Sequence, residues 1–400
     1  MLPDRTQMRL DGIADGARAL CGPEQLHIAL TTPCTPPCLC CGHRPPLIPP
    51  PAVLPHWATR LSLPYEMVRH IVEDAAAMGV ERIIYSGGGD PLLYPDLFSV
   101  LRETAERGIK ITLISNLTLA DEETIRRIVS AGVDRLVVSL WAADEEIYSR
   151  MHPGVARGSF GRILSLLKAA GRLSPAGRPM ELVIMNVICN QNVRQVELMV
   201  RLAIEIGASQ CWFQPVDVES GFLKHLLLNR AEIAFVIAAL NRCSVELQGA
   251  LRPWQPNLLG FDQFITKVRN SRAEEGIYHS DLIDSLSCVM GWYECRILAN
   301  GDVVPCCKAD RFPLGSVHAQ SFRKIWQSAG YAEFRRKAAT LSKTDQYFAA
   351  INCARCCDDW WLNQDVHRRY REHLAKQSAE GRGGWLRRSI GMLQRRLSGR

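Results

Sequence analysis

Three cysteines within eight residues form the pattern with the clearest chemical meaning in this chain, with the spacing Cys34-x3-Cys38-x2-Cys41. An iron–sulfur cubane takes four thiolates, one for each iron, so three thiolates leave one iron open. A metal with an open position can bind a substrate or cofactor directly. A structural zinc site made from the same three cysteines and Cys40 is the alternative. The residues therefore predict a metal centre, either an open iron–sulfur cluster or a closed zinc site.

The elements that must position these cysteines alternate along the chain between short apolar strands and helices. Such alternation predicts a parallel sheet covered on both faces. The predicted strands span 26–32, 82–85, 109–114, 133–140, 182–188 and 210–215. The predicted helices span 65–78, 95–107, 121–131, 159–171, 193–206 and 232–240. We therefore expect an α/β protein with a partial (β/α)6 barrel, whose chemistry lies at the C-terminal ends of the strands.

The cysteine spacing directly after an apolar strand resembles the cluster loop of the radical S-adenosylmethionine (radical SAM) superfamily. The cysteine-rich C-terminal part resembles a SPASM-type auxiliary-cluster domain, and together the resemblance covers roughly residues 26–360. It implies that Cys34, Cys38 and Cys41 hold a [4Fe–4S] cluster whose open iron chelates S-adenosylmethionine. It further implies reductive cleavage of this cofactor to a 5′-deoxyadenosyl radical, which abstracts a hydrogen atom. Cys40 stands where the family usually has an aromatic residue near the adenine.

The resemblance also implies which residues hold the cofactor. The turn Gly87–Asp90 is similar to the family's Gly-Gly-Glu element, whose backbone and carboxylate hold the amino group of the methionine moiety, with Asp in place of Glu. Polar residues at the ends of the third and fourth strands correspond to contacts with ribose or methionine, and an arginine downstream corresponds to a carboxylate ligand. The implied cofactor-binding residues are Gly88, Gly89, Asp90, Asn116, Ser139 and Arg150. Trp141, Trp212 and Gln214 are expected to line the substrate pocket or the core, and His152 and Cys189 to be structural.

A second cysteine group follows residue 287. The dipeptide Asn300-Gly301 between two β-rich runs predicts a hairpin that brings Cys288 and Cys306 together. A Cys-x2-Cys knuckle facing it makes a four-thiolate site, which fits zinc and iron–sulfur equally well on geometry. The order resembles a shortened SPASM type with a single auxiliary [4Fe–4S] cluster. The chosen ligands are Cys288, Cys306, Cys353 and Cys356, with Cys295, Cys307 and Cys357 as rivals.

Composition and charge place the chain among ordinary globular proteins. Fifteen cysteines without a secretory signal indicate a reducing cytoplasm and bound metal. The net charge of +7 comes from residues 368–400, which hold ten Lys/Arg and two Asp/Glu, so the rest is nearly neutral and indicates no nucleic-acid surface. Leu386, Ile390, Leu393 and Leu397 among arginines predict a basic amphipathic helix for an anionic membrane surface or a partner, with a disordered end as the alternative.

These patterns give a set of expectations about organisation and function. The predicted domains are 1–25 (lead-in), 26–240 (barrel), 241–287 (connector), 288–365 (SPASM-like) and 366–400 (basic tail). A small-molecule or sugar substrate, oxidised or epimerised, is favoured because the lead-in is short. A peptide-modifying maturase is the alternative, and a non-catalytic electron-transfer module is an alternative of another class. The electron donor is expected to be a flavodoxin or ferredoxin.

Overall fold

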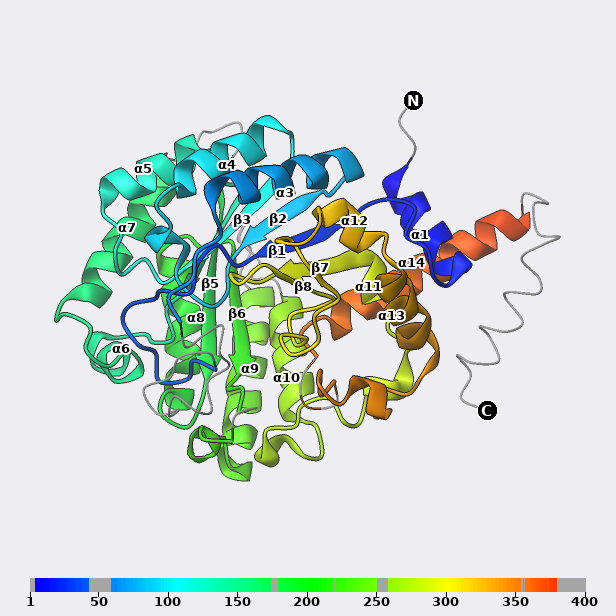
Figure 1. Cartoon of the computed structure of the whole chain (residues 1–400). Helices are drawn as coiled ribbons and strands as arrows, with labels where there is room; N and C mark the ends of the chain where they lie inside the picture. Colours follow the sequence, from blue (N-terminus) through cyan, green and yellow to red (C-terminus); the bar gives the residue numbers. More distant parts are fainter. Residues whose placement is uncertain are drawn as a thin grey trace. The chain divides into compact units, whose positions relative to one another are not determined.

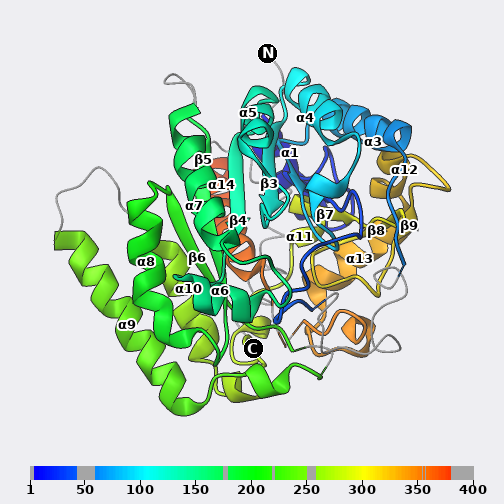
Figure 2. The same ribbon diagram turned by 90° about the vertical axis from the view of Figure 1, so that its left-hand side faces the viewer.

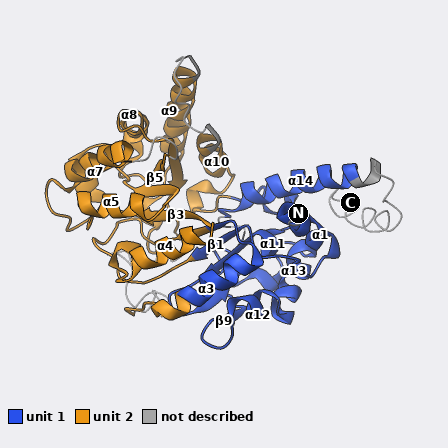
Figure 3. Cartoon of the chain, turned by 90° about the horizontal axis from the view of Figure 1, so that it is seen from above, with its two compact units in different colours: residues 1–27, 69–82, 279–400 blue, residues 28–68, 83–278 orange. Residues whose placement is uncertain are grey.

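The computed structural model groups the chain into two compact units (Figure 3). Unit 1 comprises residues 1–27, 69–82 and 279–400, and unit 2 comprises residues 28–68 and 83–278. The structure describes residues 4–42, 59–173, 179–218, 221–249, 258–353, 355 and 357–379. Within these ranges, every helix is too short or too polar to cross a lipid bilayer.

Short apolar strands form the sheet of unit 2, in the order β6-β5-β4-β3-β2. The strands are β2 (Arg82–Tyr85), β3 (Lys110–Ser115), β4 (Arg135–Ser139), β5 (Glu181–Ile188) and β6 (Gln210–Pro215). Strands β3 to β6 pair in parallel, with Ser115 opposite Val138 and Ser139 opposite Met185. The C-terminal ends of neighbouring strands therefore meet at one edge of the sheet, where chemistry is expected.

Helices follow the strands of unit 2 and cover the sheet, with α5, α7 and α8 outside the strands in both views (Figures 1 and 2). They are α4 (Leu97–Glu106), α5 (Glu122–Ser130), α6 (Glu145–Met151), α7 (Ser159–Leu173), α8 (Val196–Glu205), α9 (Arg230–Gly249) and α10 (Leu258–Val268). Helix α10 packs against β6. Helix α5 begins with a capping box in which Asp121 and Thr124 satisfy each other's backbone N–H groups.

The predicted α/β architecture with a parallel sheet is confirmed. Strands β2 and β6 and helix α3 (Tyr65–Met78) span the predicted residues. Strand β1 is shorter than predicted, at Gln25–Ile28, and α9 extends beyond residue 240. Helix α6 was not predicted, because its seven residues are too few to show a periodic pattern.

Unit 1 contains strands of which the last three pair in antiparallel, and several helices. Its strands lie in the order β1-β7-β8-β9, with β7 (Glu294–Ile297), β8 (Asp302–Val304) and β9 (Gly315–Ser316). Gly301, at a φ of 84°, makes the predicted turn between β7 and β8. The helices of this unit are α1 (Arg5–Asp15), most of α3, α11 (Met290–Tyr293), α12 (Phe322–Trp326), α13 (Ala329–Thr340) and α14 (Trp360–Ala379).

The N-terminal segment is part of unit 1, although the sequence separates residues 1–25 as a lead-in. The indole of Trp292 donates to Arg18 O at 2.9 Å, and the indole of Trp326 donates to Cys21 O at 2.9 Å. Helix α14 likewise crosses the expected boundary at residue 365. These contacts join residues far apart in sequence, so periodicity could not reveal them. The predicted amphipathic helix near the C-terminus lies outside the described residues.

Candidate active site and auxiliary metal centre

The loop that carries the first three cysteines follows β1 and is held by hydrogen bonds from neighbouring elements of unit 2. Asn116 Nδ2 and Thr118 Oγ1 both donate to Thr35 O, at 3.0 and 2.7 Å. The backbone N–H of Leu39 donates to Met151 O, at the end of α6, at 2.8 Å. The loop is thus tied to the C-terminal end of β3 and to the helix that follows β4.

The thiols of Cys34, Cys38 and Cys41 converge within this loop, and all three are partly exposed. Burial raises the pKa of the Cys38 thiol well above its usual value, and the nearby thiols of Cys41 and Cys34 raise it further. Because such electrostatic effects weaken with distance, the thiols of Cys41 and Cys34 lie near that of Cys38. Asn116 Nδ2 also lies 3.8 Å from Cys34 Sγ. Three converging thiols fit an iron–sulfur cluster with one open iron.

Cys40 differs from the other cysteines of the loop because it is 4% exposed. It packs in a hydrophobic cluster with Trp141, Met151 and Cys189. Its thiol is hydrogen-bonded to that of Cys189, and this bond and burial raise the pKa of Cys40. The closed zinc site would need Cys40 as its fourth ligand, and the engagement of Cys40 with Cys189 disfavours that alternative.

The Gly-rich turn after β2 packs directly on the start of the cysteine loop. A Cβ atom added to Gly89 would lie 2.1 Å from Pro33 O and 2.7 Å from Thr31 O. The N–H of Asp90 donates to Pro33 O at 2.9 Å. Gly87 has a φ of 88°, which glycine adopts without strain. Only glycine fits at position 89, and the turn is thereby clamped to the loop that bears the thiols.

The carboxylate of Asp90 is buried and joins the ends of β2 and β3. It accepts hydrogen bonds from Ser115 Oγ at 2.9 Å, from Asn116 N at 3.0 Å and from Leu92 N at 2.8 Å. Burial raises the pKa of Asp90, and these hydrogen bonds oppose that rise. The carboxylate therefore has a structural role in this chain, and its binding to the cofactor's amino group stays a prediction.

The remaining residues predicted to bind the cofactor lie in different surroundings. Asn116 is 6% exposed and contacts the cysteine loop, as described above. Ser139 ends β4 and is half-buried. Arg150 lies on the exposed face of α6 and forms an ion pair with Glu146 at 2.9 Å. The structure brings Asn116 to the loop, whereas the roles of Ser139 and Arg150 stay predictions.

Two asparagines, Asn186 and Asn192, form hydrogen bonds near the ends of β4 and β5 that the sequence did not predict. Trp141, which has a left-handed φ of 62°, donates its N–H to Asn186 Oδ1 at 3.0 Å. Asn192 Nδ2 donates to Trp141 O at 2.9 Å and to Val187 O at 2.8 Å. The two amides hold Trp141 in a backbone conformation that few residues adopt. A single sequence carries no signal for such contacts, because they join residues about 50 positions apart.

The other pocket candidates are buried or bonded to their neighbours. His152 is fully buried against the rings of Trp141 and Tyr148, and burial lowers its pKa to about 4. Its imidazole is therefore neutral near pH 7, which agrees with the structural role expected of it. On β6, the indole of Trp212 donates to Gln210 Oε1 at 2.9 Å. The side chain of Gln214, on the same strand, accepts a hydrogen bond from Lys267 Nζ.

A second convergence of thiols lies in unit 1, around a largely apolar pocket. Cys288, Cys306, Cys353 and Cys357 all line it. Burial raises the pKa of Cys357 well above its usual value, and the neighbouring thiols of Cys288, Cys306 and Cys353 add to that rise. Four neighbouring thiols fit a closed four-thiolate cluster. Three of the predicted ligands are thus together, and Cys356 lies outside the described residues.

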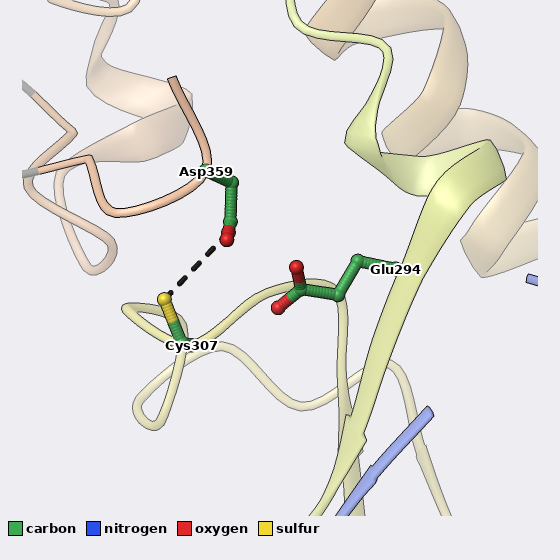
Figure 4. Close-up of side chains that lie close together, drawn as sticks. All are labelled: Glu294, Cys307 and Asp359. Carbon is green, nitrogen blue, oxygen red and sulfur yellow. Dashed lines mark hydrogen bonds between the residues drawn. The ribbon is translucent and has the colours of Figure 1, made fainter. Parts of the chain in front are cut away.

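The other two rival cysteines of unit 1 face different surroundings. Cys295 is fully buried in the core, and its thiol lies beside Tyr331. Cys307 Sγ lies 3.6 Å from Asp359 Oδ2, and the Glu294 carboxyl faces the same spot (Figure 4). Burial raises the pKa of both Glu294 and Cys307 well above their usual values. Cys307 therefore belongs to a cluster of acidic groups beside the pocket.

Two family models match the chain in succession. The model of the radical SAM superfamily matches residues 28–203, which contain the cysteine loop, the Gly-rich turn and β2 to β5. The SPASM model, an iron–sulfur cluster-binding domain, matches residues 288–357, which contain the four-thiol pocket. The chain is a radical SAM enzyme with a SPASM domain. The first domain implies S-adenosylmethionine and a [4Fe–4S] cluster, and the second implies auxiliary iron–sulfur binding. The converging thiols of both units fit these groups.

Curated relatives of this radical SAM–SPASM chain include two kinds of enzyme. An AdoMet-dependent heme synthase of Methanosarcina barkeri is 25% identical over 273 residues, which cover 65% of this chain and 72% of the relative. A PqqA peptide cyclase of Granulibacter bethesdensis is 26% identical over 269 residues, which cover 65% of this chain and 64% of the relative. The match thus spans about two thirds of the length of the peptide cyclase.

Solved structures share the fold at low sequence identity. Streptococcus suis SuiB bound to its precursor peptide SuiA matches with a TM-score of 0.60 at 17% identity, covering 87% of this chain and 74% of SuiB. The enzyme anSMEcpe, with AdoMet and a Kp18Cys peptide bound, matches with a TM-score of 0.58 at 13% identity, covering 93% of this chain and 99% of anSMEcpe. These likenesses show the radical SAM fold of this chain.

Proposed function

We propose that this radical SAM enzyme modifies a peptide, by abstracting a hydrogen atom from one of its carbon atoms. The similarity in sequence to several PqqA peptide cyclases carries the proposal. The fold shared with SuiB, whose structure contains a precursor peptide, is consistent with it. These findings favour the peptide maturase over the small-molecule or sugar substrate that the short lead-in suggested.

In this proposal, Cys34, Cys38 and Cys41 hold the cluster that binds S-adenosylmethionine. When bound, the cluster and the cofactor supply the 5′-deoxyadenosyl radical. Asn116 keeps the cysteine loop in place through its bond to Thr35, and Gly89 allows the Gly-rich turn to approach that loop.

The other cofactor contacts are assigned on the same basis. The backbone of Gly88 and Gly89 would hold the amino group of the cofactor, and Asn116 and Ser139 would contact its ribose or methionine. Arg150 would hold the methionine carboxylate in place of Glu146, and loss of that exposed i,i+4 ion pair costs only about 0.3–0.5 kcal/mol.

The auxiliary cluster is assigned to Cys288, Cys306, Cys353 and Cys357. Cys357 replaces Cys356 in this set because its thiol lines the pocket with the other three. A closed set of four thiolates leaves no position for substrate, so we assign this cluster to electron transfer with the substrate radical. A flavodoxin or ferredoxin is the expected donor of the electron that starts the reaction.

A second candidate function is the modification of a tetrapyrrole or another small molecule. The similarity to the AdoMet-dependent heme synthase favours it, since that relative is 25% identical over a comparable stretch. Both functions use the cluster held by Cys34, Cys38 and Cys41. They differ only in the substrate from which the hydrogen atom is abstracted.

The two functions are separated by one assay of the anaerobically reconstituted enzyme. Short peptides encoded beside its gene and a set of porphyrin precursors are each incubated with S-adenosylmethionine and a reductant. The peptide proposal expects 5′-deoxyadenosine together with a peptide that has lost two hydrogen atoms or, in D₂O, gained deuterium at one carbon. Turnover of a porphyrin precursor with all peptides unchanged would replace the proposal with the second candidate.

A further inference from the structure

Three acidic side chains, one thiol and two carboxyls, lie close together beside the auxiliary pocket, and all three belong to unit 1. One ligand atom each from Glu294, Cys307 and Asp359 lies within 4.8 Å of the other two (Figure 4). They come from β7, from the loop after β8 and from the start of α14. Glu294 is 2% exposed, so this is not a solvated acidic surface. The arrangement gathers one sulfur and two carboxylate ligands around a common point.

The distance between Cys307 and Asp359 matches that between two ligands of a tetrahedral metal site. Zinc binds sulfur at about 2.3 Å and carboxylate oxygen at about 2.0–2.2 Å, which sets ligand–ligand distances of roughly 3.3–3.6 Å. Cys307 Sγ and Asp359 Oδ2 are 3.6 Å apart. The Glu294 ligand atom lies within 4.8 Å of both, so its carboxyl must move closer to reach the same separation.

One oxygen of this trio lacks a hydrogen bond, which is unusual for a buried carboxylate. Glu294 Oε1 is enclosed and has no hydrogen-bond partner among the described residues. The nearest basic nitrogen is His27 Nε2, at 3.8 Å. The Glu294 carboxyl is hydrogen-bonded to Asp359, so its other oxygen, Oε1, is a buried acceptor without a partner. Such an acceptor is costly, and a bound cation would remove that cost. Glu294 is thus an independent sign that the trio holds a positively charged ligand.

The charges around the trio suit a divalent ion. A Cys307 thiolate and two carboxylates carry three negative charges, of which a divalent cation cancels two. Arg296 lies beside the trio, with its guanidinium donating to Cys307 O at 3.4 Å, and it shares its charge with Asp310 at 3.9 Å. Sulfur in the ligand set excludes magnesium and calcium, which bind oxygen, and favours zinc.

We propose that Glu294, Cys307 and Asp359 bind a mononuclear Zn²⁺ ion, separate from the auxiliary iron–sulfur cluster. Cys306 lines the four-thiol pocket while the adjacent Cys307 faces the acidic trio, so the two neighbouring cysteines serve two metal sites. His27 orients the Glu294 carboxylate as an outer partner. The fourth position on the ion is taken by water. Binding releases two protons to solvent, the thiol proton of Cys307 and the proton shared by the Glu294 and Asp359 carboxyls.

The test measures metal content in the enzyme with its clusters assembled. The parent, the double variant Cys307→Ser/Asp359→Asn and the conservative variant Glu294→Gln are loaded with iron and sulfide, exposed to Zn²⁺ and desalted. Cys295→Ser is the matched control, since Cys295 is buried next to Glu294 in the chain but its thiol lies beside Tyr331. Zinc and iron per chain are measured by elemental mass spectrometry. Anomalous diffraction from crystals is recorded at the zinc and at the iron absorption edge. Circular dichroism checks that each variant folds.

We expect one zinc per chain in the parent and in Cys295→Ser, with an anomalous peak between the three ligands. The double variant should lose this zinc and keep its iron, and Glu294→Gln should bind zinc at least ten times more weakly. Loss of iron from the double variant would show that the trio belongs to the auxiliary cluster. Absence of zinc from the parent, or a peak elsewhere, would equally overturn the proposal.

Discussion

At Gly89 the backbone of the Gly-rich turn touches the backbone that enters the cysteine loop. A Cβ there would lie 2.1 Å from Pro33 O, a contact that only a shift of the backbone can relieve. Gly89→Ala should therefore displace the turn from the loop and lower the rate of S-adenosylmethionine cleavage at least tenfold. The rate is measured as 5′-deoxyadenosine formed by the reconstituted enzyme.

Gly161→Ala is the matched control for this substitution. Gly161 lies in α7, and a Cβ added to it would meet no atom within 4 Å. Alanine should stabilise the helix by about 1 kcal/mol and leave cleavage unchanged. Equal rates for Gly89→Ala and the parent would show that the close packing of the turn is unimportant for the cofactor.

Substitution of Cys357 and of Cys295 should have opposite effects on the iron content of the auxiliary cluster. Cys357→Ala should remove about half of the iron, since one cubane of two would lose a ligand. Cys295→Ala should keep the iron, because the Cys295 thiol faces Tyr331. Iron analysis and Mössbauer spectra of both variants test this, with Cys356→Ala beside them. Retention of all iron in Cys357→Ala together with loss in Cys356→Ala would restore the ligand set expected from the sequence.

His152 gives the protein a stability that depends on pH. Its pKa is about 4 in the fold, against 6.5 for a free imidazole, because burial penalises the charged ring. The unfolded chain therefore binds more protons between these values, so stability falls as the pH drops from 6.5 to 4, by at most about 3 kcal/mol. In urea unfolding experiments, His152→Phe should reduce the slope of the free energy of unfolding against pH by an amount that corresponds to at most one bound proton. An unchanged slope would assign the acid sensitivity to other groups.

At the scale of elements, the N-terminal segment and the SPASM helices form one core. Arg335 on α13 is buried, and its guanidinium donates to Gly291 O at 2.8 Å and to Trp326 O at 2.9 Å. Trp326 in turn donates to Cys21 O. Trp326→Phe should lower the stability of unit 1 by about 1–2 kcal/mol, because Cys21 O loses its buried partner.

The corresponding control is Trp212→Phe. The indole of Trp212 is half-buried and bonds to the nearby Gln210 side chain, so its loss should cost less than about 1 kcal/mol. Urea unfolding followed by circular dichroism compares the two variants. If Trp326→Phe is no less stable than Trp212→Phe, residues 1–25 are a lead-in after all.

The sequence predicted those features that depend on residues close to one another in the chain. Periodic apolar residues gave the strands and helices of unit 2, and cysteine spacing indicated both thiol groups. The seven-residue helix α6 was missed because it is too short to show a period. The amides of Asn186 and Asn192, and the meeting of Glu294 with Asp359, were missed because such pairs are distant in sequence. The sequence favoured Cys356 over Cys357 from its Cys-x2-Cys spacing to Cys353, but spacing alone does not show which of two adjacent thiols faces the pocket.

At the scale of the whole molecule, each of the two units contains one cluster of cysteine thiols, and the two clusters differ in the number of thiols. The three-thiol loop of unit 2 suits a cluster with an open iron, and the four-thiol pocket of unit 1 suits a closed one. A closed cluster cannot chelate the cofactor, so loss of Cys353 and Cys357 should leave some uncoupled cleavage and abolish product. Full turnover by a folded Cys353→Ala/Cys357→Ala variant would make the auxiliary cluster purely structural.

Of the four cysteines in the loop, we expect only Cys34, Cys38 and Cys41 to hold the cluster that cleaves S-adenosylmethionine. The direct measurement is 5′-deoxyadenosine formation and iron content after anaerobic reconstitution of the parent, of the triple alanine variant and of Cys40→Ala. We predict that the triple variant loses all cleavage and about half of its iron. Cys40→Ala should keep both, since Cys40 is buried against Cys189. Cleavage by the triple variant, or its loss in a folded Cys40→Ala, would contradict the account.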